Sequence, residues 1–132
     1  MTPSALASVT PAGLLAVAVG AVLGAWLRWI LALSLNSVHP SLPIGTLIAN
    51  LGGGFLIGLV LAWAATHQGL DPNLRLLLIT GFLGALTTFS SFSAESLGLI
   101  QQGQFFWALL HSAVHLFGSL AAAALGYRLL AG

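Results

Sequence analysis

Four apolar stretches dominate the chain, and each is close to the ~20 residues that an α-helix needs to cross a bilayer. They cover residues 12–35, 44–66, 74–100 and 105–130. The connections between them, residues 36–43, 67–73 and 101–104, are short and contain Gly, Pro, Asn and Asp, which are typical of turns. The pattern predicts an all-α membrane protein, a single domain of residues 1–132 with four transmembrane helices that crosses the lipid bilayer several times.

Charged side chains are too scarce for a water-exposed surface, because they make up 4% of the residues against 58% hydrophobic ones. The formal net charge is only +1, which excludes nucleic acid as a partner. There is no cysteine, so neither a disulfide framework nor a thiolate metal site can form. The solvent for most of this chain must be lipid.

The few charges hardly choose an orientation in the membrane. An even number of spans puts both termini on one side, with Arg75 and Arg128 toward that face and Arg28 toward the other. Such a weak arginine asymmetry is what a chain inserted in both orientations would show, and two inverted copies could then pair. Charge alone leaves single and dual topology open.

Small residues recur every four positions in the first two spans, which lets helix backbones approach closely. The rows are Gly20-Gly24-Arg28, Gly45-Ala49-Gly53 and Asn50-Gly54-Gly58. Arg28 is open to two interpretations, a packing residue that extends its side chain to the interface or a functional cation. Asn50, near mid-span, must find partners within the protein, as an interhelical contact or as part of a site.

The third span is the most polar at membrane depth, and we expect it to be broken near its middle. Two glycines precede a run of threonine and serine from Thr87 onward, and both residue types weaken the helical hydrogen-bond ladder. Broken helices are tolerated in membranes where the freed carbonyls meet an ion or a polar cavity. The backbone carbonyls of Gly84 and Thr87 are therefore candidate cation ligands.

Beyond the predicted break lie two aromatic residues and one acidic residue. Phe89 and Phe92 are three apart, a spacing usual for packing, although the positive edge of a phenyl ring can also face an anion. A neighbouring stripe holds Thr88, Ser91 and Glu95. Glu95 is the only acidic residue inside a span, so it is either a functional carboxylate, such as a proton relay, or a structural one bonded to Thr88 or Ser91.

The fourth span gathers polar side chains on one face, within an arc of about 100° at 3.6 residues per turn. They are His111, Ser112, His115 and Ser119. The two histidines have the i, i+4 spacing of a zinc pair, but no acidic residue or third histidine stands at motif spacing nearby. We therefore predict no metal site at these histidines.

Three segments together resemble the Fluc/CrcB family of fluoride channels: GFLGALTTFSSFS at residues 81–93, GTLIAN at 45–50 and GAVLGAWLR at 20–28. The likeness covers nearly the whole chain. It implies a fluoride-selective channel of the cell (inner) membrane that exports fluoride passively and so relieves its toxicity. It also implies an antiparallel, dual-topology homodimer with two pores and a structural sodium ion at the centre of the dimer interface.

The resemblance also assigns roles to residues. Asn50 would donate to fluoride, Phe89 and Phe92 would turn ring edges to it, Ser119 would add a hydroxyl, and Arg28 would line the aqueous approach. The carbonyls of Gly84 and Thr87 would hold the sodium. A further polar track would comprise Thr88, Ser91, Glu95, Ser112 and His115, where Ser91 replaces the family's usual threonine and the roles of Glu95 and His115 stay open.

Two other functions compete with the channel. A small proton-coupled antiporter would need a membrane carboxylate in its first helix, where this chain has only Arg28, although Glu95 could act from the third span. A non-transporting accessory subunit would use the glycine rows and polar stripes for assembly alone. An enzyme is not predicted, because no catalytic triad or acidic pair at catalytic spacing is present in any span.

Overall fold

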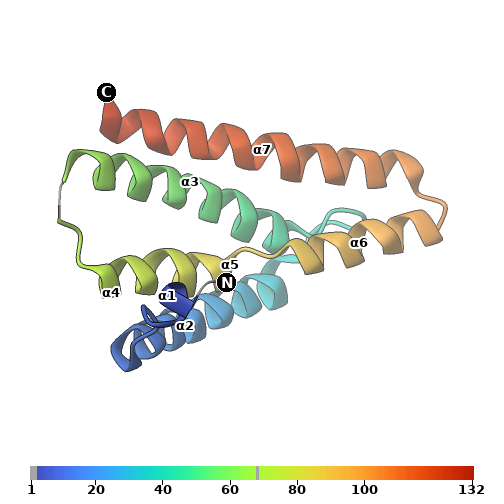
Figure 1. The fold of residues 1–132 in the computed structure, drawn as a ribbon. Helices are drawn as coiled ribbons and strands as arrows, with labels where there is room; N and C mark the ends of the chain where they lie inside the picture. Colours follow the sequence, from blue (N-terminus) through green and yellow to red (C-terminus); the bar gives the residue numbers. More distant parts are fainter. Residues whose placement is uncertain (1–2, 68) are drawn as a thin grey trace.

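The computed structural model describes residues 3–67 and 69–132, and within these ranges the regular structure is helical. A short α1 (Pro3–Leu6) precedes the long helices α2 (Pro11–Leu35) and α3 (Ile44–Thr66). The third span consists of α4 (Pro72–Arg75), the π-helix η1 (Leu76–Leu83), α5 (Gly84–Leu86) and α6 (Phe89–Gln101), and α7 (Phe105–Ala131) follows it (Figure 1).

Four helices in the described ranges are long and apolar enough to cross a membrane. They are Pro11–Leu35, Ile44–Thr66, Pro72–Gln101 and Phe105–Ala131, the third counted across its break. These bounds lie within two residues of the predicted spans, and the prediction of a four-helix, all-α membrane protein is confirmed.

Local sequence signals determine where these helices begin and turn. Thr10 caps α2 by accepting a 3.0 Å hydrogen bond from the Gly13 N–H, and a proline follows at the first helical position. Asp71 caps α4 in the same way, accepting from the Leu74 N–H at 3.0 Å. The turn between α6 and α7 contains Gly103 at φ +72°, a conformation that favours glycine.

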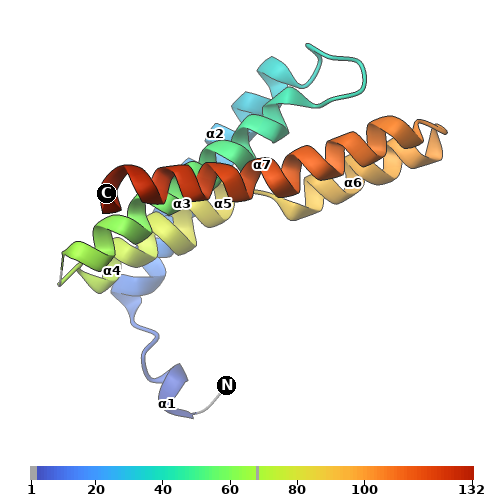
Figure 2. The same cartoon turned by 90° about the horizontal axis from the view of Figure 1, so that it is seen from above.

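The helices α3 and α7 make the most extensive contact, and both cartoon views show them side by side (Figures 1 and 2). Glycine permits this approach. A Cβ added to Gly58 would collide with the backbone carbonyl of Ala123, and one added to Gly126 would collide with that of Phe55. The two backbones are therefore in direct contact, as the row of small residues in the second span predicts.

The second extensive contact joins α2 to η1, again through glycine. A Cβ on Gly20 would collide with the Leu77 carbonyl, and one on Gly24 with the Phe82 carbonyl. The η1 segment has π-helical hydrogen bonds, which are rare and make its turns wider than α-helical turns. The third span thus already departs from α geometry before it breaks.

The break itself consists of two extended residues, Thr87 (φ −81°, ψ 151°) and Thr88 (φ −149°, ψ 116°). They form the thin link between α5 and α6 in Figure 1. Its position, three residues after Gly84 and at the start of the threonine and serine run, agrees with the break predicted from the sequence. The prediction of a broken third helix is confirmed.

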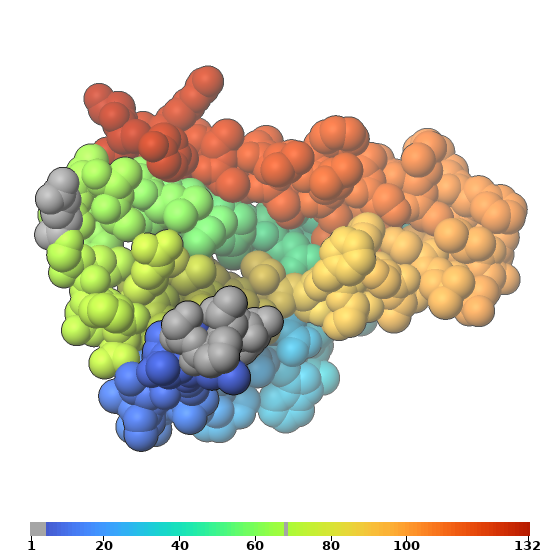
Figure 3. Space-filling view, viewed as in Figure 1, coloured from blue at the N-terminus to red at the C-terminus, as the bar shows by residue number. Residues whose placement is uncertain are grey.

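Large apolar side chains cover the outside of the molecule, whose elongated surface appears in Figure 3. Trp26, Trp29 and Leu109 are all exposed, whereas the buried apolar cluster is small and includes Ala49 and Leu86. Such a surface would be unfavourable in water. It suits a chain whose spans are surrounded by lipid, where close backbone packing replaces a large apolar core.

The backbone contact at Gly58 leads to a stability prediction. Gly58→Ala should lower the free energy of unfolding by about 1–3 kcal/mol, because the added methyl cannot fit against the Ala123 carbonyl. Gly52→Ala is the matched control in the same helix: nothing described lies within 4 Å of its added Cβ, so it should be neutral or slightly stabilising. Denaturation in detergent micelles measures both, and equal midpoints would contradict the packing described.

Candidate functional site

The side chain of Asn50, on α3, pairs with the backbone of the break. Its Oδ1 accepts from the Thr88 N–H at 2.7 Å, and its Nδ2 donates to the Thr88 carbonyl at 3.0 Å. In an unbroken helix the Thr88 N–H would bond to the carbonyl of Gly84. The Asn50 amide therefore replaces a helical bond and releases the Gly84 carbonyl from it.

Arg28, on α2, supports the same break from the other side. Its Nε donates to the Ala85 carbonyl at 2.9 Å. In a continuous helix that carbonyl would accept a hydrogen bond from the Phe89 N–H. This backbone bond is lost because the chain is extended between α5 and α6. The sequence left two interpretations open for Arg28, and the structure adds a third. Arg28 is a cation that donates to a carbonyl freed by the break.

The hydroxyls at the start of α6 are engaged locally. Thr88 is the N-cap of α6, and its Oγ1 accepts from the Ser91 N–H at 3.0 Å while its own hydroxyl lies 3.1 Å from Ser91 Oγ. Ser93 donates to the Phe89 carbonyl at 2.8 Å. Thr88 and Ser91 thus restart the helix after the break.

A groove of about 560 Å³ runs past the break and is open at the molecular surface. Its walls combine most of the residues that the resemblance singled out, namely Asn50, Gly84, Thr87, Phe89, Phe92 and Ser119. The ring centroids of Phe89 and Phe92 are 5.4 Å apart, and the two ring planes are inclined by 52°. Phe89 is 80% exposed, so its ring lies at the outer edge of the groove and is not enclosed by this chain alone. Thr88 and His115 also line the groove.

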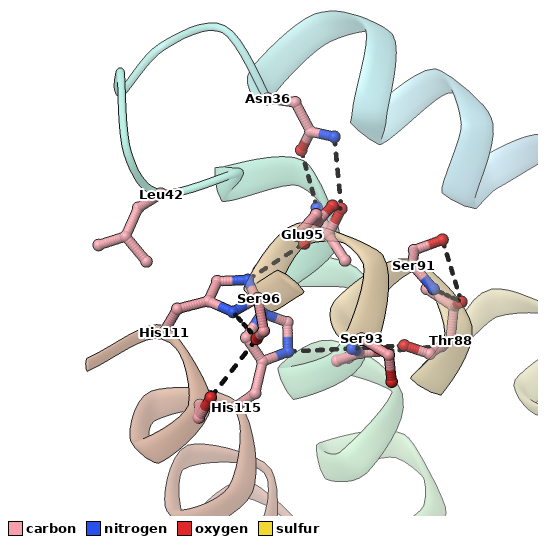
Figure 4. A network of polar contacts seen from close by, with 12 residues as sticks. Asn36, Leu42, Thr88, Ser91, Ser93, Glu95, Ser96, His111 and His115 are labelled. Atoms are coloured by element: carbon pink, nitrogen blue, oxygen red, sulfur yellow. Dashed lines mark hydrogen bonds and ion pairs between the residues drawn. The ribbon is translucent and has the colours of Figure 1, made fainter. Parts of the chain in front are cut away.

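Glu95 lies in a second polar cluster, which we call the carboxylate network: Asn36, Thr46, Glu95, Ser96 and His111 (Figure 4). Thr46 donates to Glu95 Oε1 at 2.6 Å, and His111 Nε2 lies 3.1 Å from Glu95 Oε2. The sequence-based alternative of a bond to Thr88 or Ser91 is therefore wrong. The Thr88 hydroxyl caps α6 and donates to Ser91, and the Glu95 carboxylate reaches α3 and α7 instead.

Further hydrogen bonds connect the carboxylate network to the end of α2 and to α7. Asn36, the C-cap of α2, accepts from the Thr46 N–H at 3.0 Å, and Ser96 Oγ lies 2.8 Å from His111 Nδ1. Ser112 donates to the Ala108 carbonyl at 2.8 Å and lies 3.4 Å from Ser96 Oγ, so it joins this network and not the groove. Contacts between α2, α3, α6 and α7 are tied together by these bonds.

Sequence reasoning missed three members of this network, Asn36, Thr46 and Ser96. Thr46 stands one helical turn before Asn50 and is 3% exposed, and that spacing was an available signal. It also missed the metal-like grouping of Glu95, His111 and His115, whose ligand atoms all lie within 4.8 Å of one another. No acidic residue stands at motif spacing from the two histidines in the sequence, and Glu95 reaches them only because α6 packs against α7.

His115, on α7, connects the groove to the network. It is 5% exposed, its ring centroid lies 4.9 Å from that of Phe92 and 4.4 Å from that of His111, and its Nδ1 lies 3.0 Å from Asn50 Nδ2. Phe92 in turn stacks on His111 at 5.2 Å with an interplanar angle of 11°. The aromatic wall of the groove is therefore packed against imidazole rings.

Four apolar spans and a broken third helix define a multi-pass membrane protein, and a groove with several polar side chains lies at its break. Comparison with known families specifies this class further. Residues 15–127 match the family described as CrcB-like protein, Camphor Resistance (CrcB), and the chain belongs to this family.

Curated relatives are similar over almost their full length. A protein of Cupriavidus pinatubonensis (strain JMP 134 / LMG 1197), named fluoride-specific ion channel FluC, is 58% identical over 124 residues, which are 92% of this chain and 98% of that protein. Proteins with the same name from Ralstonia pickettii (strain 12J) and Pseudomonas syringae pv. maculicola are 57% and 54% identical. These two alignments cover 87% and 86% of this chain, and 91% and 89% of the relatives.

The contact between Arg28 and the break can be tested by stability. Arg28→Leu should lower the free energy of unfolding by about 1–3 kcal/mol, because the Ala85 carbonyl loses its donor at membrane depth. Arg128→Leu, at an exposed position in the last turn of α7, is the control and should change stability by no more than about 0.5 kcal/mol. Equal unfolding midpoints for the two variants would show that the Arg28 bond contributes nothing.

Proposed function

We propose that this chain forms a fluoride-selective channel through which fluoride leaves the cell passively, relieving fluoride toxicity. The observation that carries the proposal is the groove at the helix break, where Asn50, Phe89, Phe92 and Ser119 line one space. The names of the relatives support fluoride as the transported ion, since each is called a fluoride-specific ion channel. The cell (inner) membrane is the proposed location.

The groove has the chemistry that a small, strongly hydrated anion requires. Fluoride gives up its water only where hydrogen-bond donors and positive dipoles replace it, and the ring edges of Phe89 and Phe92 supply such dipoles in a mostly apolar passage. Ser119 adds a hydroxyl on the facing helix α7. A narrow aromatic wall disfavours chloride, which is larger and gains less from each close contact.

A homodimer of two antiparallel copies completes the proposal. The groove opens at the surface of one chain, and the ring of Phe89 is left 80% exposed, so one copy does not enclose a passage. A second, inverted copy would cover this face, and two such grooves would make two pores. The near absence of arginine asymmetry is compatible with insertion in both orientations.

A sodium ion at the centre of that dimer is proposed on the chemistry of the break. The Thr87 carbonyl belongs to the extended break, and the Gly84 carbonyl, at the start of α5, has lost its helical partner to Asn50. Unwound carbonyls in membrane helices are suitable ligands for sodium. Two copies would offer four such oxygens, and the ion would hold the paired breaks together.

The competing functions fit the site less well. A proton-coupled antiporter would have to use Glu95, but both of its carboxylate oxygens are engaged, by Thr46 and His111. A purely structural subunit gives no reason for polar groups to line a groove beside two phenylalanines. The family is one of transport proteins, and the chain is not an enzyme.

Fluoride transport is tested by efflux from liposomes. Purified protein reconstituted in vesicles loaded with potassium fluoride should release fluoride rapidly on addition of valinomycin, whereas matched potassium chloride vesicles should release almost no chloride. Phe92→Ile should reduce fluoride efflux at least about tenfold, because the ring edge is removed from the groove. Phe117→Ile, at an exposed position on α7, is the control and should behave as the wild type. Folded wild-type protein without fluoride efflux would refute the channel.

Dual topology is tested by the accessibility of one introduced cysteine. The chain has no cysteine, so Gln102→Cys, at the exposed turn between α6 and α7, creates a unique label site. A membrane-impermeant thiol reagent added to intact cells should label about half of the chains, and disruption of the membrane should expose the other half. Labelling of all chains from a single side would contradict an antiparallel dimer.

A further inference from the structure

Three side chains bring metal-binding atoms together where α6 packs against α7. They are Glu95 on α6 and His111 and His115 on α7. One carboxylate oxygen and one nitrogen of each imidazole ring all lie within 4.8 Å of one another. Two imidazoles and one carboxylate form a ligand set that holds zinc in proteins, with a fourth position left for a ligand from solution. The group therefore has the composition of a transition-metal site.

The distance between the first two ligands already suits a metal ion. His111 Nε2 lies 3.1 Å from Glu95 Oε2. Zinc bonds of about 2.0–2.1 Å at a tetrahedral angle place two ligand atoms about 3.3 Å apart. The His111 ring is fully buried and Phe92 stacks on it, so its orientation is already determined. An ion between these two atoms requires little movement of either side chain.

Neighbouring hydroxyl groups hold both ligands from their far sides. Ser96 Oγ lies 2.8 Å from His111 Nδ1, where it accepts the ring proton when Nε2 binds a metal. Thr46 donates to the other carboxylate oxygen, Glu95 Oε1, at 2.6 Å. Histidine and carboxylate ligands of protein metal sites have such outer contacts, which orient them toward the ion. The hydroxyls of Ser96 and Thr46 thus suit metal binding at Nε2 and Oε2.

His115 supplies a nitrogen that has no partner. Its side chain is 5% exposed, and its Nε2 makes no hydrogen bond to any residue that the structure describes. Its ring centroid lies 4.4 Å from that of His111. A buried polar atom in this state indicates a ligand from outside the chain. The Nε2 atom is therefore the third ligand position beside Glu95 and His111.

Binding through Nε2 of His115 has one local cost. Asn50 Nδ2, which can only donate, lies 3.0 Å from His115 Nδ1. A ring that binds a metal at Nε2 carries its proton on Nδ1, so this contact must open. One neutral hydrogen bond changes an equilibrium constant by about tenfold, whereas the apparent binding constants of zinc sites are larger by several orders of magnitude. The metal bond outweighs the lost contact.

A hydrated ion reaches these residues from the nearby ends of the helices. Glu95 lies six residues before Gln101, where α6 ends, and His111 lies six residues after Phe105, where α7 begins. At the helical rise these intervals correspond to about 9 Å. His115, one turn further along α7, also lines the groove that is open at the surface. The ligands are thus within about two helical turns of the aqueous side.

We propose that Glu95, His111 and His115 form a binding site for a divalent transition-metal ion such as Zn²⁺, and that the bound ion slows the passage of an anion along the groove. Imidazole ligands favour Zn²⁺ over Mg²⁺ and Ca²⁺. A divalent ion facing one carboxylate leaves an excess positive charge, which attracts an anion to the fourth position. Because conduction requires an ion to leave its site readily, a metal-held anion moves slowly. The site is independent of the proposed channel, whereas the effect on transport rests on it.

Binding is tested on the purified full-length protein in detergent micelles. Co²⁺ should give the visible absorption of a tetrahedral site at one ion per chain, and Zn²⁺ should displace it whereas Mg²⁺ should not. In ¹⁵N NMR of histidine-labelled protein, zinc should shift the His111 and His115 signals. His39 and His67, assigned with His39→Gln and His67→Gln samples, should not shift. Absence of the Co²⁺ bands, or zinc shifts confined to His39 and His67, would overturn the site.

A mild variant tests the ligand geometry without removing a ligand. Ser96→Ala should weaken zinc binding by at least about tenfold, because His111 loses its outer contact. Ser93→Ala is the matched control on the same helix, since that hydroxyl bonds only the Phe89 carbonyl among the described residues. His111→Gln should abolish the Co²⁺ spectrum. If His111→Gln does not fold, Ser96→Ala and the wild-type NMR decide, and equal zinc affinities of Ser96→Ala and Ser93→Ala would contradict His111 as a ligand.

The effect on transport is measured in the fluoride-loaded liposomes. Zinc should lower fluoride efflux from wild-type vesicles by at least about tenfold, EDTA should restore it, and His111→Gln vesicles should not respond to zinc. Unchanged efflux from protein that NMR shows to hold zinc would overturn the effect on transport. Absence of fluoride efflux from folded, metal-free wild type would remove the channel and leave the metal site, which the Co²⁺ spectrum and the NMR signals report separately.

Discussion

The pairing of one side-chain amide with one backbone residue makes this fold possible. A membrane helix cannot normally be broken, because its freed N–H and C=O groups find no water in the hydrocarbon region. Here Asn50 bonds both the N–H and the carbonyl of Thr88, and Arg28 bonds the carbonyl of Ala85. Three side-chain hydrogen bonds thus replace the helical ones, and the chain can leave helical geometry at mid-span without unsatisfied groups at these atoms.

Those bonds need helices that lie unusually close, and glycine provides the closeness. The contact of α3 with α7 at Gly58 and Gly126, and of α2 with η1 at Gly20 and Gly24, brings backbones together where a methyl group would collide. An amide as short as that of Asn50 can then reach another helix. The hydrogen bonds of these polar groups therefore depend on the close packing of the helices. The small apolar core is sufficient because lipid covers the rest of the apolar surface.

The polar groups of the protein fall into two connected clusters with different degrees of satisfaction. In the carboxylate network, Glu95, Thr46 and His111 all have partners within the chain, and this saturation ties α3, α6 and α7 together. In the groove, the buried Nε2 atom of His115 has no hydrogen-bond partner among the described residues. Phe92 lies between the two, stacked on His111 and packed against His115.

The sequence by itself determined the four spans, the weak charge bias and the break after Gly84, because span length, hydropathy and backbone propensity are local properties of the chain. It also placed Asn50, Phe89 and Phe92 correctly on their helices. Only the tertiary structure decided which polar groups meet: the Glu95 contacts with Thr46 and His111, the Arg28 bond to Ala85, and the contact of Asn50 with His115. These depend on how each helix is rotated and shifted against its neighbours, and a hydrogen bond of about 3 Å is lost with a displacement far smaller than one helical turn.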